Sequence, residues 1–129
     1  HPGLVGHSDA DVVIHAVVDA LLGAGGLGDI GERFPDTDPK WRGVASRAFL
    51  AAAVELLGPD GWTIENVDCT IVTEAPKIAP VRSAMREHLE GVVGAPVNVK
   101  ASRAEGLGAL GRVEGAACWA VASLRRNLS

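Results

Sequence analysis

The chain has 129 residues and a formal net charge of −4 at pH 7, and this length fits a single domain. Its 47% hydrophobic and 22% charged residues are typical of a globular protein and exclude an intrinsically disordered one. The negative charge argues against a non-specific nucleic-acid binder. With 4% aromatic residues and no tyrosine, we expect a thin aliphatic core that leaves room for stabilisation by oligomerisation.

The first predicted element is a helix that starts at Asp9 and takes Ser8 as its N-cap. Residues 8–11 read Ser-Asp-Ala-Asp, a capping-box pattern with Asp in the fourth place. The glycines of the run Gly23–Gly26 end the helix. The apolar run 12–27 raises the question of a membrane span, but two ionisable side chains near its centre argue against that interpretation.

Four ionisable side chains follow one another at intervals of four residues: His7 just before the helix, then Asp11, His15 and Asp19 within it. Steps of four keep the last three on one stripe of the helix. Their apolar neighbours predict a mostly buried helix, and a buried charge needs a partner or a metal. Asp11 and His15 can therefore bind a metal together, and Asp19 can support these ligands through a hydrogen bond. The alternative interpretation is a solvated helix face.

The rest of the chain alternates predicted helices with predicted strands. The segment 28–43, rich in Gly, Pro and Asp, predicts a long loop of the kind that often carries function. The further predicted elements are a helix at 44–57, a strand at 63–73, a helix at 81–93, a strand at 97–101, a glycine-rich loop at 105–115 and a strand at 116–124. We therefore expect an α/β or α+β domain with a small mixed sheet and helices packed on one face.

Polar side chains in the predicted loops are further candidates for a site. Asp29, Asp36 and Asp38 either cap turns or serve a site, and capping is the simpler interpretation. Lys77 lies between two prolines in the stretch EAPKIAP. The rigid backbone on both sides suits a lysine that contacts a base or a phosphate.

A second group surrounds the glycine-rich loop. Ser102, Arg103 and Glu105 place a hydroxyl, a cation and a carboxylate beside exposed amides, a combination that can bind a metal-diphosphate. An ordinary turn with solvated charges is an equal alternative. Arg112 and Glu114, which lie among glycines, either pair with each other or face a partner chain.

The two cysteines, Cys69 and Cys118, are far apart and form no Cys-x-x-Cys pair. We expect reduced thiols in the core, which fits a cytoplasmic protein. No basic residues precede an apolar run at the start of the chain, so we expect no signal peptide.

Four blocks of the sequence read HSDADVVIHAVVDALLGAGGLGDIGERFPDTDPKWRG, NVDCTIVTEAPKIAP, NVKAS and GLGALGRVEG. In this order they resemble the 2-C-methyl-D-erythritol 2,4-cyclodiphosphate synthase family. The resemblance implies a homotrimer of α/β subunits with active sites between neighbours. It implies the conversion of 4-diphosphocytidyl-2-C-methyl-D-erythritol 2-phosphate to the cyclic diphosphate with release of CMP, a step of non-mevalonate isoprenoid synthesis. Zinc, or another divalent transition metal, and magnesium or manganese would position the phosphates.

The resemblance also implies roles for individual residues. His15 would bind zinc, and His7 and Ser8 would lie at the phosphate and methylerythritol side of the substrate. The other implied contacts are Asp36 in a loop that closes over the substrate, Asp29 and Gly31 at the ribose, Thr73, Ala75 and Lys77 at the cytidine, and Ser102, Arg103 and the magnesium ligand Glu105 at the diphosphate. Arg112 and Glu114 would lie near the trimer axis, where an isoprenoid diphosphate would bind.

The sequence departs from the family pattern in three places. The family's N-terminal strand with a D-x-H motif, which supplies two further zinc ligands, has no counterpart before Gly6. The chain reads Ser102-Arg103-Ala104 in place of a threonine run, and Val113 in place of the middle glycine of G-R-G-E-G. The first departure implies either a chain that lacks the family's N-terminal segment or a variant that handles the metal otherwise. From the chain as written, with Asp11 as a candidate second donor, we expect weak zinc binding and little synthase activity.

Two other functions fit the same residues. The His/Asp stripe also suits a metal-dependent phosphohydrolase, and the missing D-x-H motif suits a non-catalytic nucleotide-binding trimer. Release of inorganic phosphate instead of CMP would identify the first, and metal analysis of the purified protein would identify the second.

Overall fold

The computed structural model of the chain describes residues 7–40, 45–72, 82–102 and 117–128, and the side chains of residues 7–9 lie outside this description. The chain alternates helices with strands, as the sequence predicts. The elements are α1 (His7–Ala24), α2 (Ile30–Arg33), α3 (Ser46–Leu57), β1 (Trp62–Val72), α4 (Arg82–Val93), β2 (Val97–Ser102) and β3 (Ala117–Arg126).

The three strands form one mixed sheet in the order β2-β1-β3. β1 pairs in parallel with β2, and α4 makes the crossover between them, because parallel neighbours need a long connection. β1 pairs antiparallel with β3, with one irregularity between Ile64 and Asn66. The expected small mixed sheet is confirmed as a single α+β domain.

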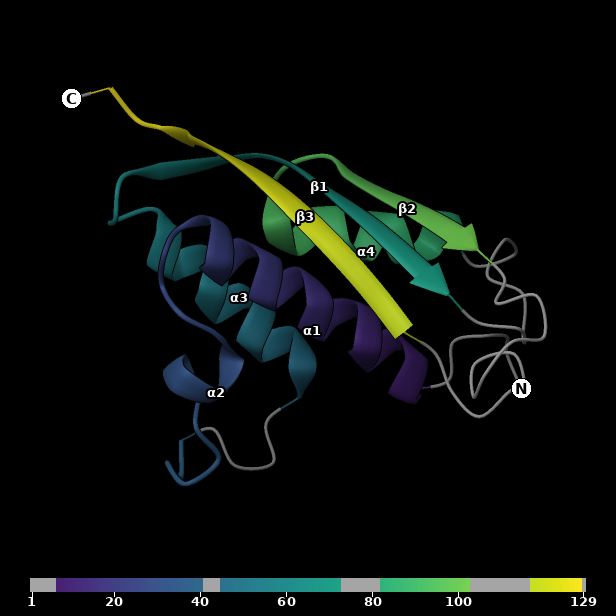
Figure 1. The fold of residues 1–129 in the computed structure, drawn as a ribbon, viewed down its shortest axis with the longest axis horizontal. Coiled ribbons are helices and arrows are strands. Elements are labelled where there is room, and N and C mark those ends of the chain that lie inside the picture. The colour runs from purple at the N-terminus through teal and green to yellow at the C-terminus, as the bar shows by residue number, and fades with distance from the viewer. Residues whose placement is uncertain (1–6, 41–44, 73–81, 103–116, 129) are drawn as a thin grey trace.

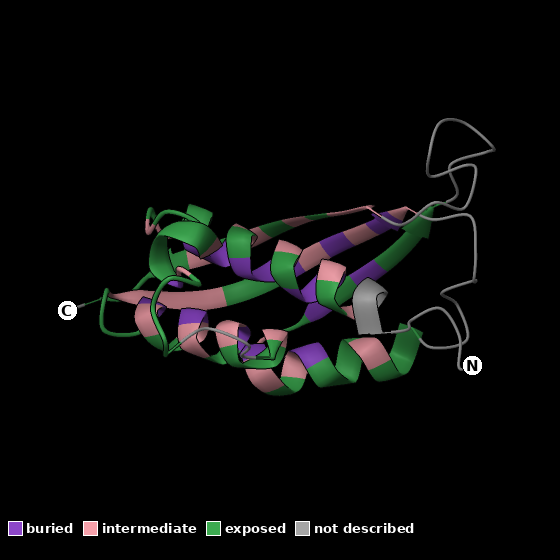
Figure 2. Ribbon diagram, turned by 90° about the horizontal axis from the view of Figure 1, so that it is seen from below, coloured by how far each residue is buried: buried purple, intermediate pink, exposed green. Residues whose placement is uncertain are grey.

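The long helices cover one face of this sheet (Figure 1). α1 packs against β3, α4 packs against β2, and α3 contacts both of these helices. Buried residues lie on the sides of the helices and strands that face one another (Figure 2). The fully buried side chains are aliphatic, as the composition predicts: Leu21, Leu22, Leu50, Leu57, Ile71, Leu89, Val13, Val17, Val18, Val67 and Val97.

The other face of the sheet carries both charged and apolar side chains. Lys100 on β2 donates a hydrogen bond to Asp68 on β1 over 2.8 Å. This bond and a second one from Asn98 hold the pKa of the Asp68 carboxyl below its ordinary value. On β3, Trp119 and Val121 point to the same side as Asp68, because they alternate with inward residues. They remain 60% and 71% exposed.

Two predictions about element boundaries are wrong. Helix α1 begins at His7, so His7 lies in the helix and not before it, and Ser8 is not the N-cap. A capping pattern places a helix start only to within one or two residues. The segment predicted as a continuous loop contains the helix α2, which is four residues long and therefore too short to produce a periodic pattern. Within the described ranges, no helix is both long and apolar enough to span a bilayer.

Candidate functional site

The polar stripe of α1 faces solvent. Asp11, His15 and Asp19 are all exposed, whereas Val17 and Val18 on the opposite side of the helix are fully buried. The apolar side of α1 is buried as predicted, and the alternative interpretation of a solvated face describes Asp11, His15 and Asp19 in the single chain. The sheet covers the apolar side of α1, and the polar stripe contacts α3 and the start of α2 while staying exposed.

Two side chains of α3 meet this stripe. The Ser46 hydroxyl donates a 2.5 Å hydrogen bond to Oδ1 of Asp11, which joins the first turn of α3 to α1. The His15 imidazole meets the Phe49 ring edge-on, with centroids 6.3 Å apart. Asp11 thus has a structural partner, and its role as a metal ligand stays a prediction.

Asp19 and Asp29 organise the start of α2. The backbone N–H of Ile30 donates to Oδ1 of Asp19 over 3.0 Å, and the N–H of Glu32 donates to Oδ1 of Asp29 over 2.9 Å. Asp29 is the N-cap of α2, and its predicted capping role is confirmed. Asp38 likewise accepts the backbone N–H of Lys40 over 3.0 Å, so it closes a turn as expected.

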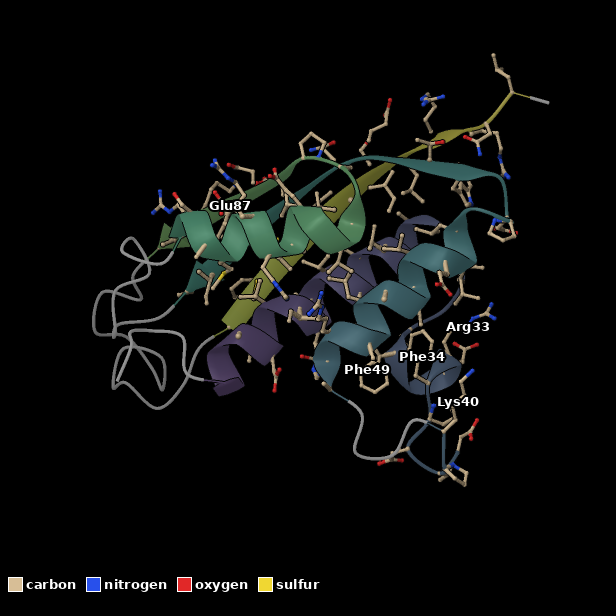
Figure 3. The ribbon with its side chains drawn as sticks, turned by 180° about the vertical axis from the view of Figure 1, so that it is seen from behind. Arg33, Phe34, Lys40, Phe49 and Glu87 are labelled. Atoms are coloured by element: carbon tan, nitrogen blue, oxygen red, sulfur yellow. The ribbon has the colours of Figure 1, made fainter. Side chains whose placement is uncertain are left out.

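Phe34 and Phe49 hold α2 against α3 (Figure 3). Their rings lie 5.5 Å apart between centroids, and Phe34 is buried. Arg33 donates from Nε to the carbonyl oxygen of Leu27 over 2.5 Å. The side chains of Arg33 and Lys40 lie on either side of Phe34 in the same view.

The ends of the strands gather at one end of the molecule. Val72, the last residue of β1, is directly opposite Ser102 at the end of β2 and Ala117 at the start of β3. Helix α1 begins at this same end (Figure 1). Ser102 is exposed there. The strands lead into the segments 73–81 and 103–116, which lie outside the described residues and carry Thr73, Ala75, Lys77, Arg103, Glu105, Arg112 and Glu114.

The predicted ribose contacts lie away from this end. Asp29 and Gly31 belong to α2, and Asp19 fixes α2 to α1 twelve residues beyond His7. At about 1.5 Å per residue, that is roughly 18 Å along the helix. Figure 1 likewise shows α2 far from the carboxyl ends of β1 and β2. Within one subunit, Asp29 and Gly31 are therefore too far from Ser102 to contact the same nucleotide.

A small apolar hollow of about 210 Å³ lies between the first half of α1 and the middle of α4. Its lining comprises Ala10, Val13, Ile14, Met85, His88 and Leu89. Sequence reasoning did not identify it, because it depends on how the two helices pack.

A metal site is not complete in the part of the chain that the structure describes. No group of three or more His, Cys, Asp and Glu side chains close enough to hold a metal ion occurs among the described residues. The exposed imidazole of His15 and the second oxygen of Asp11 provide part of a donor set. The side chains of His7 and Glu105, which the resemblance places nearby, lie outside the description.

Both cysteines are free thiols, as predicted. Burial, together with the nearby Cys118 and Asp68, raises the pKa of the Cys69 thiol to about 12. Burial also raises the pKa of Cys118 to about 11. Neither thiol is therefore ionised at neutral pH, and neither is activated as a nucleophile.

Comparison with known proteins identifies the family. The model of the YgbB family matches residues 1–125. The chain belongs to the YgbB family. The chain is 54% identical over 127 residues to 2-C-methyl-D-erythritol 2,4-cyclodiphosphate synthase of Bordetella petrii, covering 96% of this chain and 78% of that protein. The resemblance inferred from the four sequence blocks is therefore confirmed.

Other YgbB relatives are longer or have a solved structure. The bifunctional enzyme IspD/IspF of Anaeromyxobacter dehalogenans is 52% identical over 127 residues, which cover 96% of this chain. The chain spans about a third of the length of this protein, at 33%. The structure of IspF from Plasmodium falciparum in complex with CDP matches 96% of this chain and 76% of that one, with a TM-score of 0.81 and 31% identity.

Proposed function

We propose that this chain catalyses the cyclisation of 4-diphosphocytidyl-2-C-methyl-D-erythritol 2-phosphate to 2-C-methyl-D-erythritol 2,4-cyclodiphosphate with release of CMP. The observation that carries the proposal is the 54% identity to a synthase of that name, together with the exposed His15 and the α2 cap in a matching fold. We place the reaction in the cytoplasm. The CDP complex of the Plasmodium falciparum relative supports a cytidine diphosphate substrate.

Each end of the folded subunit would contribute half of a nucleotide site. Asp29 and Gly31 at α2 would contact the ribose. The opposite end would hold the base with Thr73, Ala75 and Lys77, and the diphosphate with Ser102, Arg103 and Glu105. Since Asp29 and Gly31 lie far from Ser102 in one subunit, the pocket would form between neighbouring copies, in a homotrimer. Arg112 would face the trimer axis and an isoprenoid diphosphate.

The chemistry needs little proton transfer, so positioning supplies most of the rate. An oxygen of the 2-phosphate attacks the β-phosphorus, the bond between this phosphorus and the bridging oxygen breaks, and CMP leaves with that oxygen. His7, Ser8 and Asp36 would orient the 2-phosphate for in-line attack. The cytidine and ribose contacts would hold the leaving group in place.

His15, with Asp11 as the second donor, would hold zinc, and Glu105 would hold magnesium or manganese. A divalent cation supplies charge stabilisation for the phosphates when bound. The Asp11–Ser46 hydrogen bond would keep the Asp11 carboxylate in place on the stripe, one turn before His15.

The test is an assay of the purified chain with the diphosphocytidyl substrate, followed by ³¹P NMR. We expect one CMP released for each cyclic diphosphate formed. Inorganic phosphate as the product would instead support a metal-dependent phosphohydrolase. Binding of CDP without turnover, in the presence of zinc and magnesium, would support a non-catalytic nucleotide-binding trimer.

A further inference from the structure

Helix α2 depends on a few identifiable contacts for its position. Asp29 caps it locally, and Arg33 bonds back to Leu27 only six residues away. Asp19 is different, because its carboxylate accepts the Ile30 N–H from eleven residues away, on another helix. Between described residues, this hydrogen bond links α1 to the first turn of α2.

The connection between α1 and α2 is closed by a backbone hydrogen bond from Leu27 to Leu22. It contains Gly26 and Gly28, whose φ angles of 71° and 91° lie in the left-handed region. Glycine adopts this region without a steric penalty but leaves the chain many other conformations. The position of α2 therefore depends on contacts outside the connection as well, namely Asp19 at its start and the buried Phe34 at its end.

The bonded amide lies between the two proposed ribose contacts. Ile30 is flanked in the sequence by Asp29 and Gly31. Asp19 and Asp29 accept the N–H groups of Ile30 and Glu32. The N–H of Gly31 lies between these two bonded amides, in the first turn of α2.

Asp19 also has a fixed relation to His15. The two residues are four apart on the exposed stripe of α1, so their side chains lie one turn apart on a rigid helix. One carboxylate thus connects the segment that would hold the ribose to the helix that would hold the metal.

We propose that Asp19 is a positioning residue that sets the location of Asp29 and Gly31 relative to His15. It does not touch the substrate. The proposal rests on the proposed function, since it requires the Asp29–Gly31 pair to contact the ribose of a cytidine nucleotide.

The experiment compares Asp19→Ala, which removes the acceptor, with Asp19→Asn, which retains a side-chain oxygen. Glu90→Ala is the matched control, because Oε2 of Glu90 also accepts a backbone N–H, from Val97 over 2.9 Å, but joins α4 to β2. Calorimetry on the full chain gives the affinities for CDP and for 2′,3′-dideoxy-CDP. The ratio of the two dissociation constants reports the ribose contacts alone.

For Asp19→Ala we expect CDP to bind about five- to tenfold more weakly, which is the usual effect of losing one hydrogen bond. The dideoxy-to-CDP ratio should fall towards one. Asp19→Asn and Glu90→Ala should keep the wild-type ratio within about twofold, even if Glu90→Ala lowers the melting temperature. Faster hydrogen exchange at the Ile30 amide in Asp19→Ala alone would support the same tether.

Three results would contradict the proposal in distinguishable ways. An unchanged ratio in Asp19→Ala, with CDP bound normally by the wild type, would overturn the positioning role while leaving the proposed function intact. An equal fall of the ratio in Glu90→Ala would mean that any loss of stability has this effect. Failure of the wild-type chain to bind CDP at all would overturn the proposed function and this inference together.

Discussion

The imidazole of His15 is exposed in the middle of α1, one turn beyond Asp11. If it is a zinc ligand, His15→Ala should weaken zinc binding by more than the roughly 10- to 100-fold that loss of a supporting partner causes. Competition with a chelating dye measures this affinity. His88→Ala is the control, because His88 is also an exposed helical histidine, on α4. Equal zinc affinity of His15→Ala and wild type would contradict the assignment.

Lys77 would contact the cytosine from a segment with prolines at positions 76 and 80. Loss of one charge-assisted hydrogen bond costs about 1.5–3 kcal/mol, so Lys77→Ala should weaken CMP binding by at least about tenfold. Arg86→Ala serves as the control, since it removes an exposed cation on α4, away from the uncovered sheet face. Calorimetry that gave the same CMP affinity for Lys77→Ala and wild type would rule out this contact.

The buried thiol of Cys69 predicts a loss of stability in alkaline solution. Its pKa rises from 9.0 to about 12 in the folded chain, so between these values the folded state retains a proton that the unfolded state has lost. The contribution is complete below pH 9 and decreases as the pH rises towards 12. The free energy of unfolding should fall by up to about 1.4 kcal/mol per pH unit for this group.

Urea unfolding at pH 8, 9 and 10 tests this slope. Cys69→Val keeps a small apolar side chain and removes the titration, so its stability should decline less steeply than that of the wild type. The difference between the two slopes cancels the contribution of the lysines, which ionise in the same range. Parallel slopes would show that the Cys69 thiol is not protected.

At the scale of the elements, helix α2 shows where sequence reasoning stops. Asp29 was identifiable as a capping residue because its bond spans three residues. The partner of Asp19 was not, because its bond joins two helices across eleven residues and depends on the turn at Gly26 and Gly28. A local sequence pattern predicts a contact between residues three apart, but it does not predict a contact between two helices.

The strands give the same result. The alternation around Val67, Cys69 and Ile71 predicted β1 within one residue at each end, because inward and outward side chains alternate along a strand. The order β2-β1-β3 was beyond the sequence pattern, which carries no information on which strands are neighbours. The exposure of the α1 stripe was left open for a related reason: apolar neighbours on a helix do not show which side the sheet covers.

Helix α2 should depend on Phe34 as much as on Asp19. Phe34 is 6% exposed and packs on Phe49, so Phe34→Ala should lower the free energy of unfolding by about 3–5 kcal/mol. Phe34→Leu should cost less, because it refills most of the cavity. Thr37→Ala, an exposed substitution three residues on, should have almost no effect. Urea denaturation measures all three, and equal stability of Phe34→Ala and Thr37→Ala would show that this packing contributes little.

At the scale of the whole molecule, the uncovered sheet face is the surface best suited to contact another copy. Trp119 and Val121 are 60% and 71% exposed there, and burying them would stabilise an assembly by about 25 cal/mol per Å² of apolar surface. We expect light scattering at micromolar concentration to give three times the subunit mass of 13.3 kDa. Val121→Lys should dissociate the trimer and abolish CDP binding, because each pocket would lose one half. Ala51→Lys, on the exposed side of α3, should leave both properties unchanged. A monomeric wild type, or a Val121→Lys chain that remains trimeric, would exclude this face as the interface.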